Sequence, residues 1–356
     1  MIVESVAIIA ITKKGIEIAK SLKTQFFQWE VFAPSKFSNN DSKINWFEDS
    51  TTSKVGELFK KYDALVCIFS LGAVIRLVSP HMRDKKTDPA VVVIDDTAKF
   101  VISTLSGHLG GANKLTEEIS KILDAIPVIT TAADVNQTIA VDLVGKEFGW
   151  TIDDDSTVTR VSAFMVNEEK IGIYQDAGEK DWWTPKKEFP KNITIYNSLE
   201  ELRNSGSKGY LIISDKSIED KELLKNAVVY RPKTLVVGVG LHWDTSKETI
   251  KEGIEFCMKK FLLSTKSIAR FASIKKESEV VGLQELAREW NVTIDYFEKD
   301  QLAQIAIPNP SETVQAFEGT PSVSEASALR SSNGKLVVEK QKFPPNLTVA
   351  IARISK

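Results

Sequence analysis

The sequence contains few of the residues that build disulfide scaffolds, metal sites and basic binding surfaces. Its 356 residues include two cysteines and three histidines, and the formal net charge is −2. Cys67 and Cys257 lie in unrelated segments without the spacing of metal ligands, which excludes a disulfide framework and indicates a reducing compartment. A net charge this close to zero provides no field that would attract nucleic acid.

Long hydrophobic runs are also absent. No segment approaches the ~20 apolar residues of a membrane span. The first apolar run, Val6–Ile11, is short, follows Glu4 and lacks the basic flank of a signal peptide. We therefore expect a cytoplasmic protein that binds neither membranes nor nucleic acid.

The chain does contain a regular alternation of short apolar runs and helical patterns, long enough for two or three domains. Runs rich in Val and Ile predict strands, and the amphipathic segments between them predict helices. The alternation predicts an N-terminal α/β domain over residues 1–135, with a largely parallel sheet between layers of helices. The predicted strands are Val6–Ile11, Trp29–Ala33, Ala64–Phe69, Ala90–Ile94, Phe100–Thr104 and Pro127–Thr130, and the predicted helices are Gly15–Lys23, Lys54–Lys61, Ala73–Val78 and Gly111–Leu123.

Two further domains are predicted. A helix over Gln137–Phe148 opens an irregular α/β middle domain, residues 136–231, and Arg231–Lys233 contains a proline typical of a linker. Residues 232–356 predict a three-layer α/β domain with a mixed sheet, in which Thr245 and Glu248 have the spacing of a capping box. The predicted strands are Lys170–Tyr174, Asn192–Tyr196, Tyr210–Ser214, Val228–Arg231, Thr234–Gly240, Ser267–Ile274, Val292–Phe297, Lys335–Glu339 and Thr348–Ile354.

The most informative motif is the glycine-rich turn Ser106–Asn113, between a predicted strand and a predicted helix. It matches neither the Walker A loop nor the dinucleotide fingerprint. One interpretation is an anion or oxyanion cradle at the start of a helix, with His108 as a general acid or base. The other is a tight turn in which Ser106 caps the helix and His108 lies in the core. The candidate binding residues of the turn are Ser106, Gly107, Gly110, Gly111 and Asn113.

Charged and hydroxyl side chains near other predicted strand ends are further candidates. Basic residues either clamp a ligand with several carboxylates or form a solvated face; they are Arg76, Arg83, Lys85 and Lys86. Ligands of α/β sheets bind at the carboxyl ends of parallel strands, so acidic residues there are either catalytic or caps. These candidates are Asp95, Asp96 and Asp134, beside the hydroxyls of Thr130 and Thr131. Glu325 has the spacing of a capping box with Ser322, which is the interpretation we favour for it.

Several of these segments, in this order, resemble the CbiG family of cobalamin biosynthesis, the cobalt-precorrin-5A hydrolases. The N-terminal ones are Gly72–Arg76, Lys86–Val91, Leu105–Asn113 and Pro127–Ala132. Matching C-terminal segments are Leu235–Gly240, Gly319–Leu329, Leu336–Lys340 and Leu347–Ala352. The chain departs from the family pattern at Leu241-His242 and at Lys275–Glu277, so ligand roles at those positions are not carried over.

The resemblance implies a substrate that is a cobalt-bearing tetrapyrrole with acetate and propionate arms and a δ-lactone. Hydrolysis opens the lactone, releases acetaldehyde and gives cobalt-precorrin-5B. The implied roles are an oxyanion cradle for the backbone of Gly107–Gly111, and proton transfer by His108 or one of the aspartates. The basic residues would hold the substrate carboxylates. Because cobalt arrives inside the macrocycle, we expect no cofactor and no metal site in the protein.

Two other functions remain open from the residues alone. A carrier for corrin intermediates needs the same cradle and clamps but does no chemistry. An α/β enzyme for phosphate ligands needs only the glycine-rich turn. The expected partners are the tetrapyrrole substrate, neighbouring enzymes of the pathway and a second copy of the chain.

Overall fold

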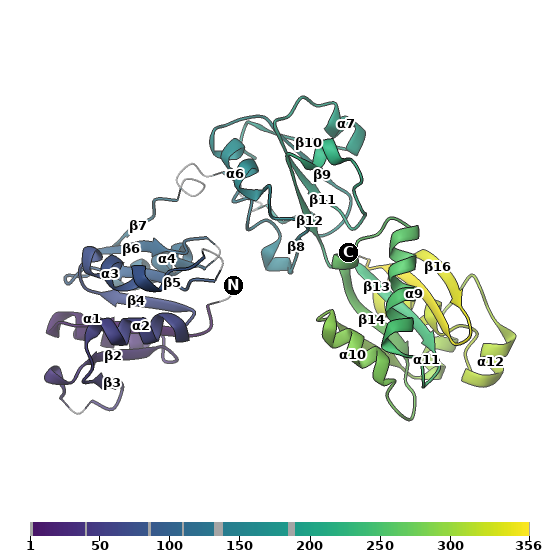
Figure 1. The fold of residues 1–356 in the computed structure, drawn as a ribbon, viewed down its shortest axis with the longest axis horizontal. Coiled ribbons are helices and arrows are strands. Elements are labelled where there is room, and N and C mark those ends of the chain that lie inside the picture. The colour runs from purple at the N-terminus through teal and green to yellow at the C-terminus, as the bar shows by residue number, and fades with distance from the viewer. Residues whose placement is uncertain are drawn as a thin grey trace. The chain divides into compact units, whose positions relative to one another are not determined.

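The computed structural model describes residues 3–39, 41–84, 87–108, 110–131, 138–183 and 189–355. The chain divides into two compact units, Met1–Leu143 and Val144–Lys356. The first unit holds one sheet and the second holds two (Figure 1). The predicted class, a multi-domain α/β protein, is confirmed.

The first unit is a seven-stranded sheet in the order β3-β2-β1-β4-β5-β6-β7. All neighbouring strands are parallel except β5 and β6, so the prediction of a largely parallel sheet is confirmed. The elements are β1 Val6–Ala10, α1 Lys13–Gln25, β2 Glu30–Pro34, β3 Ile44–Phe47, α2 Thr51–Lys61, β4 Ala64–Ile68, α3 Leu71–Val78, β5 Ala90–Ile94, β6 Phe100–Leu105, α4 Ala112–Leu123 and β7 Ile126–Val128, with 3-10 turns at Ser35–Phe37 and Ser79–His81.

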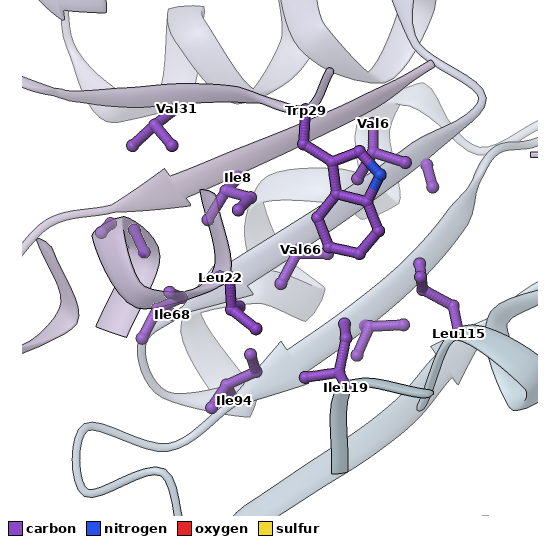
Figure 2. Packing of buried hydrophobic residues seen from close by; sticks show 14 of the residues in the cluster. Val6, Ile8, Leu22, Trp29, Val31, Val66, Ile68, Ile94, Leu115 and Ile119 are labelled. Atoms are coloured by element: carbon purple, nitrogen blue, oxygen red, sulfur yellow. The ribbon is translucent and has the colours of Figure 1, made fainter. Parts of the chain in front are cut away.

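The central strands are buried on both faces, as their unbroken runs of apolar residues require. Figure 2 shows one face of this core, where Ile8, Val66 and Ile94 of neighbouring strands lie under Leu22 and Ile119. These last two residues come from α1 and α4. In α4, Leu115 and Ile119 are four residues apart and both buried, so one face of this helix covers the sheet.

The second unit begins with a sheet in the order β10-β9-β11-β12-β8, parallel except for its edge strand β8. The elements are β8 Thr151–Ile152, α6 Val158–Val166, β9 Ile171–Gln175, β10 Ile193–Tyr196, α7 Leu199–Arg203, β11 Gly209–Ile213, α8 Lys221–Leu224 and β12 Ala227–Arg231. The helix predicted over Gln137–Phe148 is wrong for its described part, which forms turns and a 3-10 segment, Lys146–Phe148. Gly145 adopts a left-handed backbone at φ +68°, which interrupts a right-handed helix, and a Cβ there would lie 1.9 Å from Trp150 Cε3, so the position requires glycine.

The third sheet has the order β15-β14-β13-β17-β16, with parallel strands on one side of β13 and the antiparallel pair β17 and β16 on the other. The mixed sheet predicted from the sequence is confirmed. The elements are β13 Leu235–Leu241, α9 Lys247–Lys260, β14 Ile268–Ile274, α10 Val281–Glu289, β15 Thr293–Phe297, α11 Lys299–Ala303, α12 Glu312–Glu318, α13 Ser324–Ser332, β16 Lys335–Phe343 and β17 Leu347–Arg353, with a 3-10 turn at Thr265–Ser267.

The predicted linker around Pro232 is instead a buried junction between the two sheets of the second unit. Arg231 is 3% exposed and donates from Nη2 to Asp153 Oδ2 at 2.6 Å. Asp215, fully buried, accepts two hydrogen bonds of 2.7 Å from the guanidinium of Arg353. A buried bidentate pair holds two segments in one geometry, so this junction is a structural tie.

The capping box predicted at Thr245 is also wrong. The helix α9 is capped one residue later, where Ser246 Oγ accepts from the N–H of Thr249 at 3.2 Å. Thr245 is buried, and its hydroxyl donates to the carbonyl of His242 at 2.9 Å. Thr245 therefore holds the loop ahead of the helix.

Candidate functional site

The glycine-rich turn connects β6 to α4 and uses its own carbonyls to satisfy the start of the helix. The N–H of Ala112 donates to Ser106 O at 3.2 Å, and that of Asn113 donates to Gly107 O at 3.0 Å. These two N–H groups therefore already have acceptors, and they are not available to bind an anion at the start of the helix. In the described part of the chain, the N–H groups of Gly107 and Gly110 have no such acceptor.

Ser106 shapes the turn but does not cap the helix through its side chain. Its backbone lies in the left-handed region at φ +55°, and its hydroxyl donates to the carbonyl of Asp88 at 2.9 Å. The residue at the N-cap position is Gly111, at φ +89°, a conformation that glycine adopts at low cost. The expected substrate contact through the Ser106 hydroxyl is therefore not available while this bond is made.

Two glycines of the turn are required by close approach. A Cβ at Gly110 would lie 2.4 Å from the Cβ of Ser106, and a Cβ at Gly107 would lie 2.7 Å from Asn113 Oδ1. Both distances are far below van der Waals contact, so any side chain would displace the turn. The backbone geometry of the turn therefore requires glycine at positions 107 and 110.

Asn113 joins three elements at the base of the turn. The residue is 8% exposed, its Oδ1 accepts from Ser103 Oγ at 2.6 Å, and its Nδ2 donates to Thr131 Oγ1 at 2.9 Å. These bonds connect β6, α4 and the segment after β7. Asn113 and Thr131, both predicted to bind substrate, are therefore brought together, with a positioning role that the sequence did not reveal. Thr130 beside them is exposed.

His108 projects from the turn towards a carboxylate that sequence reasoning missed. His108 Nδ1 lies 3.8 Å from Asp142 Oδ1, and the two side chains are 16% and 21% exposed. His108 is therefore half-buried beside a charge at this end of the sheet and does not lie within the apolar core, which was the other interpretation of this residue. No motif marks Asp142, which lies within the segment predicted as helix.

The loop before β5 reaches the same edge of the sheet. Asp88 is 7% exposed, and both of its carboxylate oxygens accept from the backbone N–H of Arg83 at 3.0 Å. The side chain of Arg83 itself is exposed. Because Asp88 also accepts from Ser106 through its carbonyl, the loop carrying Arg83 is fixed directly to the glycine-rich turn. We call the region formed by these described residues the β6 edge; it comprises Arg83, Asp88, Ser106–His108, Gly110–Asn113, Thr131 and Asp142.

Asp95 and Asp96, predicted as catalytic carboxylates, lie at the opposite end of β5. The strands β5 and β6 are antiparallel, with Val91 beside Leu105, so the turn lies where β5 begins and the aspartates lie where it ends. Five residues of strand, ~16 Å at ~3.3 Å per residue, separate the two ends. Asp95 and Asp96, predicted as alternatives to His108 for proton transfer, therefore do not share its end of the sheet.

Both aspartates have structural partners. Asp95 closes the β5–β6 turn by accepting from the N–H groups of Phe100 at 2.6 Å and Thr97 at 3.0 Å. Burial alone would raise the pKa of Asp95, but the hydrogen bonds from Thr97 and Phe100 outweigh it and the pKa is lowered. Asp96 accepts a hydrogen bond from the Thr12 hydroxyl. The interpretation as turn caps is the one that the geometry supports.

Arg76 is the last of the candidate site residues that the structure describes. Arg76 is exposed, and its Nη1 donates to Gly72 O at 3.1 Å, so its guanidinium is folded back over the first turn of α3, away from the β6 edge. Three predicted site residues lie outside the described residues, namely Lys85, Lys86 and Asp134.

Two observations on the described ranges bear on cofactors and membranes. No group of three or more His, Cys, Asp or Glu side chains is arranged to hold a metal ion there. None of the helices in those ranges has the length and apolar character that a bilayer crossing needs. The two cysteines are free and buried.

Three family profiles match consecutive parts of the chain. The profile described as Cobalamin synthesis G N-terminal matches residues 53–134, and Cobalamin biosynthesis central region matches residues 139–232. Cobalamin synthesis G C-terminus matches residues 235–352. A solved structure of a cobalamin biosynthesis protein G homolog from Sulfolobus solfataricus is 24% identical and covers 99% of this chain and 97% of its own, with a TM-score of 0.38.

Two curated relatives have the same description. A cobalt-precorrin-5A hydrolase from Priestia megaterium is 41% identical over 353 residues, which is 98% of this chain and 94% of that protein. A cobalt-precorrin-5A hydrolase from Salmonella typhimurium is 28% identical over 341 residues, 94% of each chain. With the three family regions in order and 41% identity over almost its whole length, the chain belongs to the CbiG family of cobalamin biosynthesis proteins.

Proposed function

We propose that this chain is a cobalt-precorrin-5A hydrolase, which opens the δ-lactone of its substrate and releases acetaldehyde. The observation that carries the proposal is the 41% identity to a curated enzyme of that description over 98% of the chain. The β6 edge supports it, because its turn holds a histidine and backbone donors that have no acceptor in the described ranges, and the Asp142 carboxylate lies beside that histidine.

Attack of water on the lactone carbonyl develops negative charge on its oxygen. The N–H groups of Gly107 and Gly110, without acceptors in the described part of the chain, are the donors that can receive this oxyanion. A fixed donor of this kind contributes ~10²–10³ in rate, because it needs no reorganisation when the charge appears. In this proposal, Gly107 and Gly110 supply the cradle, and Gly111 only allows the chain to enter the helix.

His108 is the group placed to move a proton. As a general base it takes a proton from the attacking water, and as an acid it returns one to the departing oxygen, which together contribute ~10²–10⁴. The alcohol freed by this step then loses its O–H proton as the bond between its carbon and the macrocycle breaks. Acetaldehyde leaves, and the macrocycle carbon takes up a proton in place of the lost carbon. At 3.8 Å the contact with Asp142 is longer than a hydrogen bond, so the carboxylate acts on His108 through its charge. Asp142 is thus a positioning residue for His108, a role that the sequence analysis assigned to no residue.

The substrate carries its cobalt within the macrocycle and many carboxylates around it. The exposed guanidinium of Arg83, fixed to the turn through Asp88, is placed to hold one of those carboxylates. Lys85 and Lys86 follow in the sequence and add charge of the same sign. We propose that no cofactor besides the substrate's own cobalt takes part. Two free cysteines suit a reaction in the reducing interior of the cell.

The test is anaerobic incubation of the purified chain with cobalt-precorrin-5A, with an assay for acetaldehyde and for the mass of the tetrapyrrole. Catalytic release of acetaldehyde, with the matching loss of mass from the macrocycle, is the expected result. Stoichiometric binding of the tetrapyrrole with no acetaldehyde and an unchanged mass would instead identify a carrier.

A further inference from the structure

The C-terminal sheet carries a groove that the proposed chemistry at the β6 edge does not use. It has a volume of about 440 Å³ and lies where β13 ends, lined by α12, the segment that leads into α13 and the β16–β17 hairpin. Its volume falls within the ~300–1,000 Å³ typical of small-molecule sites. We call it the C-terminal groove.

The floor of the groove is formed by a close approach of three elements. Gly240 near the end of β13 lies so close to its neighbours that a Cβ would be 2.5 Å from Thr348 Oγ1 of β17 and 3.3 Å from Val323 Cβ. Val323 immediately precedes α13. Because a side chain at Gly240 would force these elements apart, the glycine sets the depth of the groove.

One wall is fixed by a buried carboxylate. Glu325 is fully buried and accepts from Asn309 Nδ2 at 2.8 Å, from the N–H of Asn309 at 3.3 Å and from the N–H of Lys340 at 3.1 Å. The capping box expected with Ser322 is present only in part, since Ser322 Oγ accepts from the N–H of Glu325 at 3.4 Å. The carboxylate instead holds the loop before α12 against β16, a fixed arrangement of the kind binding sites require.

The walls are mostly apolar and include an exposed aromatic ring. Phe317 on α12 is 85% exposed at the groove, which is costly for so large an apolar side chain without a partner. Val314 on the same helix and Phe343 at the end of β16 also line the groove. The Phe343 ring packs edge-on against Phe256 of α9, with 5.6 Å between the ring centroids, so Phe317 is the ring left open to a flat ligand.

Two lysines give the groove a positive charge. Lys342 is exposed and makes no ion pair with any residue in the described ranges. Lys340, half-buried, donates its ammonium to the carbonyl of Asn309. The one carboxylate lining the groove, Glu318, is paired with Lys276 at 3.0 Å, which offsets its charge.

We propose that the C-terminal groove is a second binding site for the tetrapyrrole, with part of the ring against Phe317 and a carboxylate arm on Lys342. The inference rests on the proposed function for the identity of the ligand. Apolar walls beside an exposed cation match a ring whose faces are apolar and whose acidic arms lie on its periphery. A phosphate ligand would instead need a cluster of donors, whereas Leu241, Val323 and Leu347 give the groove an apolar lining.

The test uses the full chain with two groove variants, each with a matched control. Lys342→Glu reverses a charge in the groove, and Lys335→Glu makes the same change at an exposed position of the same strand outside it. Phe317→Ala removes a ring from the groove, and Phe27→Ala removes one that is 81% exposed in the other unit. The probe is uroporphyrin III, a stable tetrapyrrole with many carboxylates, and far-UV circular dichroism confirms that each variant folds.

Each groove variant is expected to raise the Kd for uroporphyrin III by about fivefold to tenfold. The controls should stay within twofold of the unsubstituted chain. Groove variants that bind uroporphyrin III like their controls would overturn the proposal and leave the hydrolase function untouched. If the unsubstituted chain binds uroporphyrin III in a groove-dependent way but releases no acetaldehyde, the groove stands and the hydrolase function fails.

Discussion

The β6 edge and the C-terminal groove are built in opposite ways. The edge is formed largely by consecutive residues, Ser106–Asn113, whose backbone groups bond to one another and whose glycines are required by contacts of 2.4 and 2.7 Å. The groove is assembled from segments more than 100 residues apart, and its walls are side chains with few polar bonds among them. A site that depends on the shape of one backbone turn is encoded by consecutive residues and appears as a motif in the sequence. A site formed by apolar side chains from separate segments leaves no such motif.

In the two proposals above, proton transfer takes place at the β6 edge and a tetrapyrrole binds in the C-terminal groove. The largest expected effect is therefore that of His108→Ala, which should lower kcat for acetaldehyde release by about 10²–10⁴ because the proton-transfer group is lost. Asp142→Asn, which keeps the shape and removes the charge, should lower kcat by about tenfold. A His108→Ala protein that releases acetaldehyde as fast as the unsubstituted chain would show that His108 is not the acid or base.

The second effect tests whether the edge depends on backbone shape. Gly110→Ala places a Cβ 2.4 Å from that of Ser106, so the turn must move and the donors at Gly107 and Gly110 lose their alignment. We expect kcat to fall by about 10², the contribution of one oxyanion donor. Gly72→Ala is the control, because its Cβ would meet only Arg76 Nη1 at 3.5 Å, and it should leave kcat within twofold.

The third prediction concerns Glu325, which holds one wall of the groove, and its substitution should affect the groove without affecting kcat at the β6 edge. Glu325→Gln keeps the size of the side chain but places amide donors beside the N–H groups of Asn309 and Lys340. We expect the free energy of unfolding in urea to fall by about 1–3 kcal/mol and the affinity for uroporphyrin III to weaken. Glu312→Gln, at an exposed position in the first turn of α12, should change neither measurement. A lower kcat in Glu325→Gln with unchanged probe affinity would contradict the division between the two sites.

The smallest effect concerns the carboxylates at the far end of β5. The double variant Asp95→Asn with Asp96→Asn should keep acetaldehyde release within twofold, since both residues act as caps. A rate of acetaldehyde release lowered by about 10² or more would instead place the active site at the carboxyl ends of the parallel strands.

Asp95 at this end of β5 should make the stability of the folded chain depend on pH. The pKa of Asp95 is lowered in the folded chain, so its carboxylate stabilises the fold above the unfolded pKa of ~3.9, and this contribution is lost as pH falls through the folded value. The difference in Tm between the unsubstituted chain and Asp95→Asn should therefore shrink below about pH 4. A difference that is constant down to pH 2 would show that the charge of Asp95 is not what stabilises the turn.

Much of the fold followed from periodicity, because buried strands and amphipathic helices leave strong local patterns. The reversal of β6 did not, and it moved the aspartates away from the glycine-rich turn. A signal for it was nevertheless present, since only five residues join β5 to β6, fewer than a parallel crossover needs. The helix expected over Gln137–Phe148 failed because Gly145 adopts a left-handed backbone, which periodicity does not reveal.

By itself, the sequence determined the α/β class, the family and the glycine-rich turn, since each rests on local pattern or on residues close together in the chain. Only the tertiary structure decided which candidates share an edge, because strand direction places chain neighbours at opposite ends of a sheet. It brought Asp142 to His108 and removed Asp95 and Asp96. It also formed the C-terminal groove, whose residues have no common motif and meet only when β13, α12 and the β16–β17 hairpin pack together.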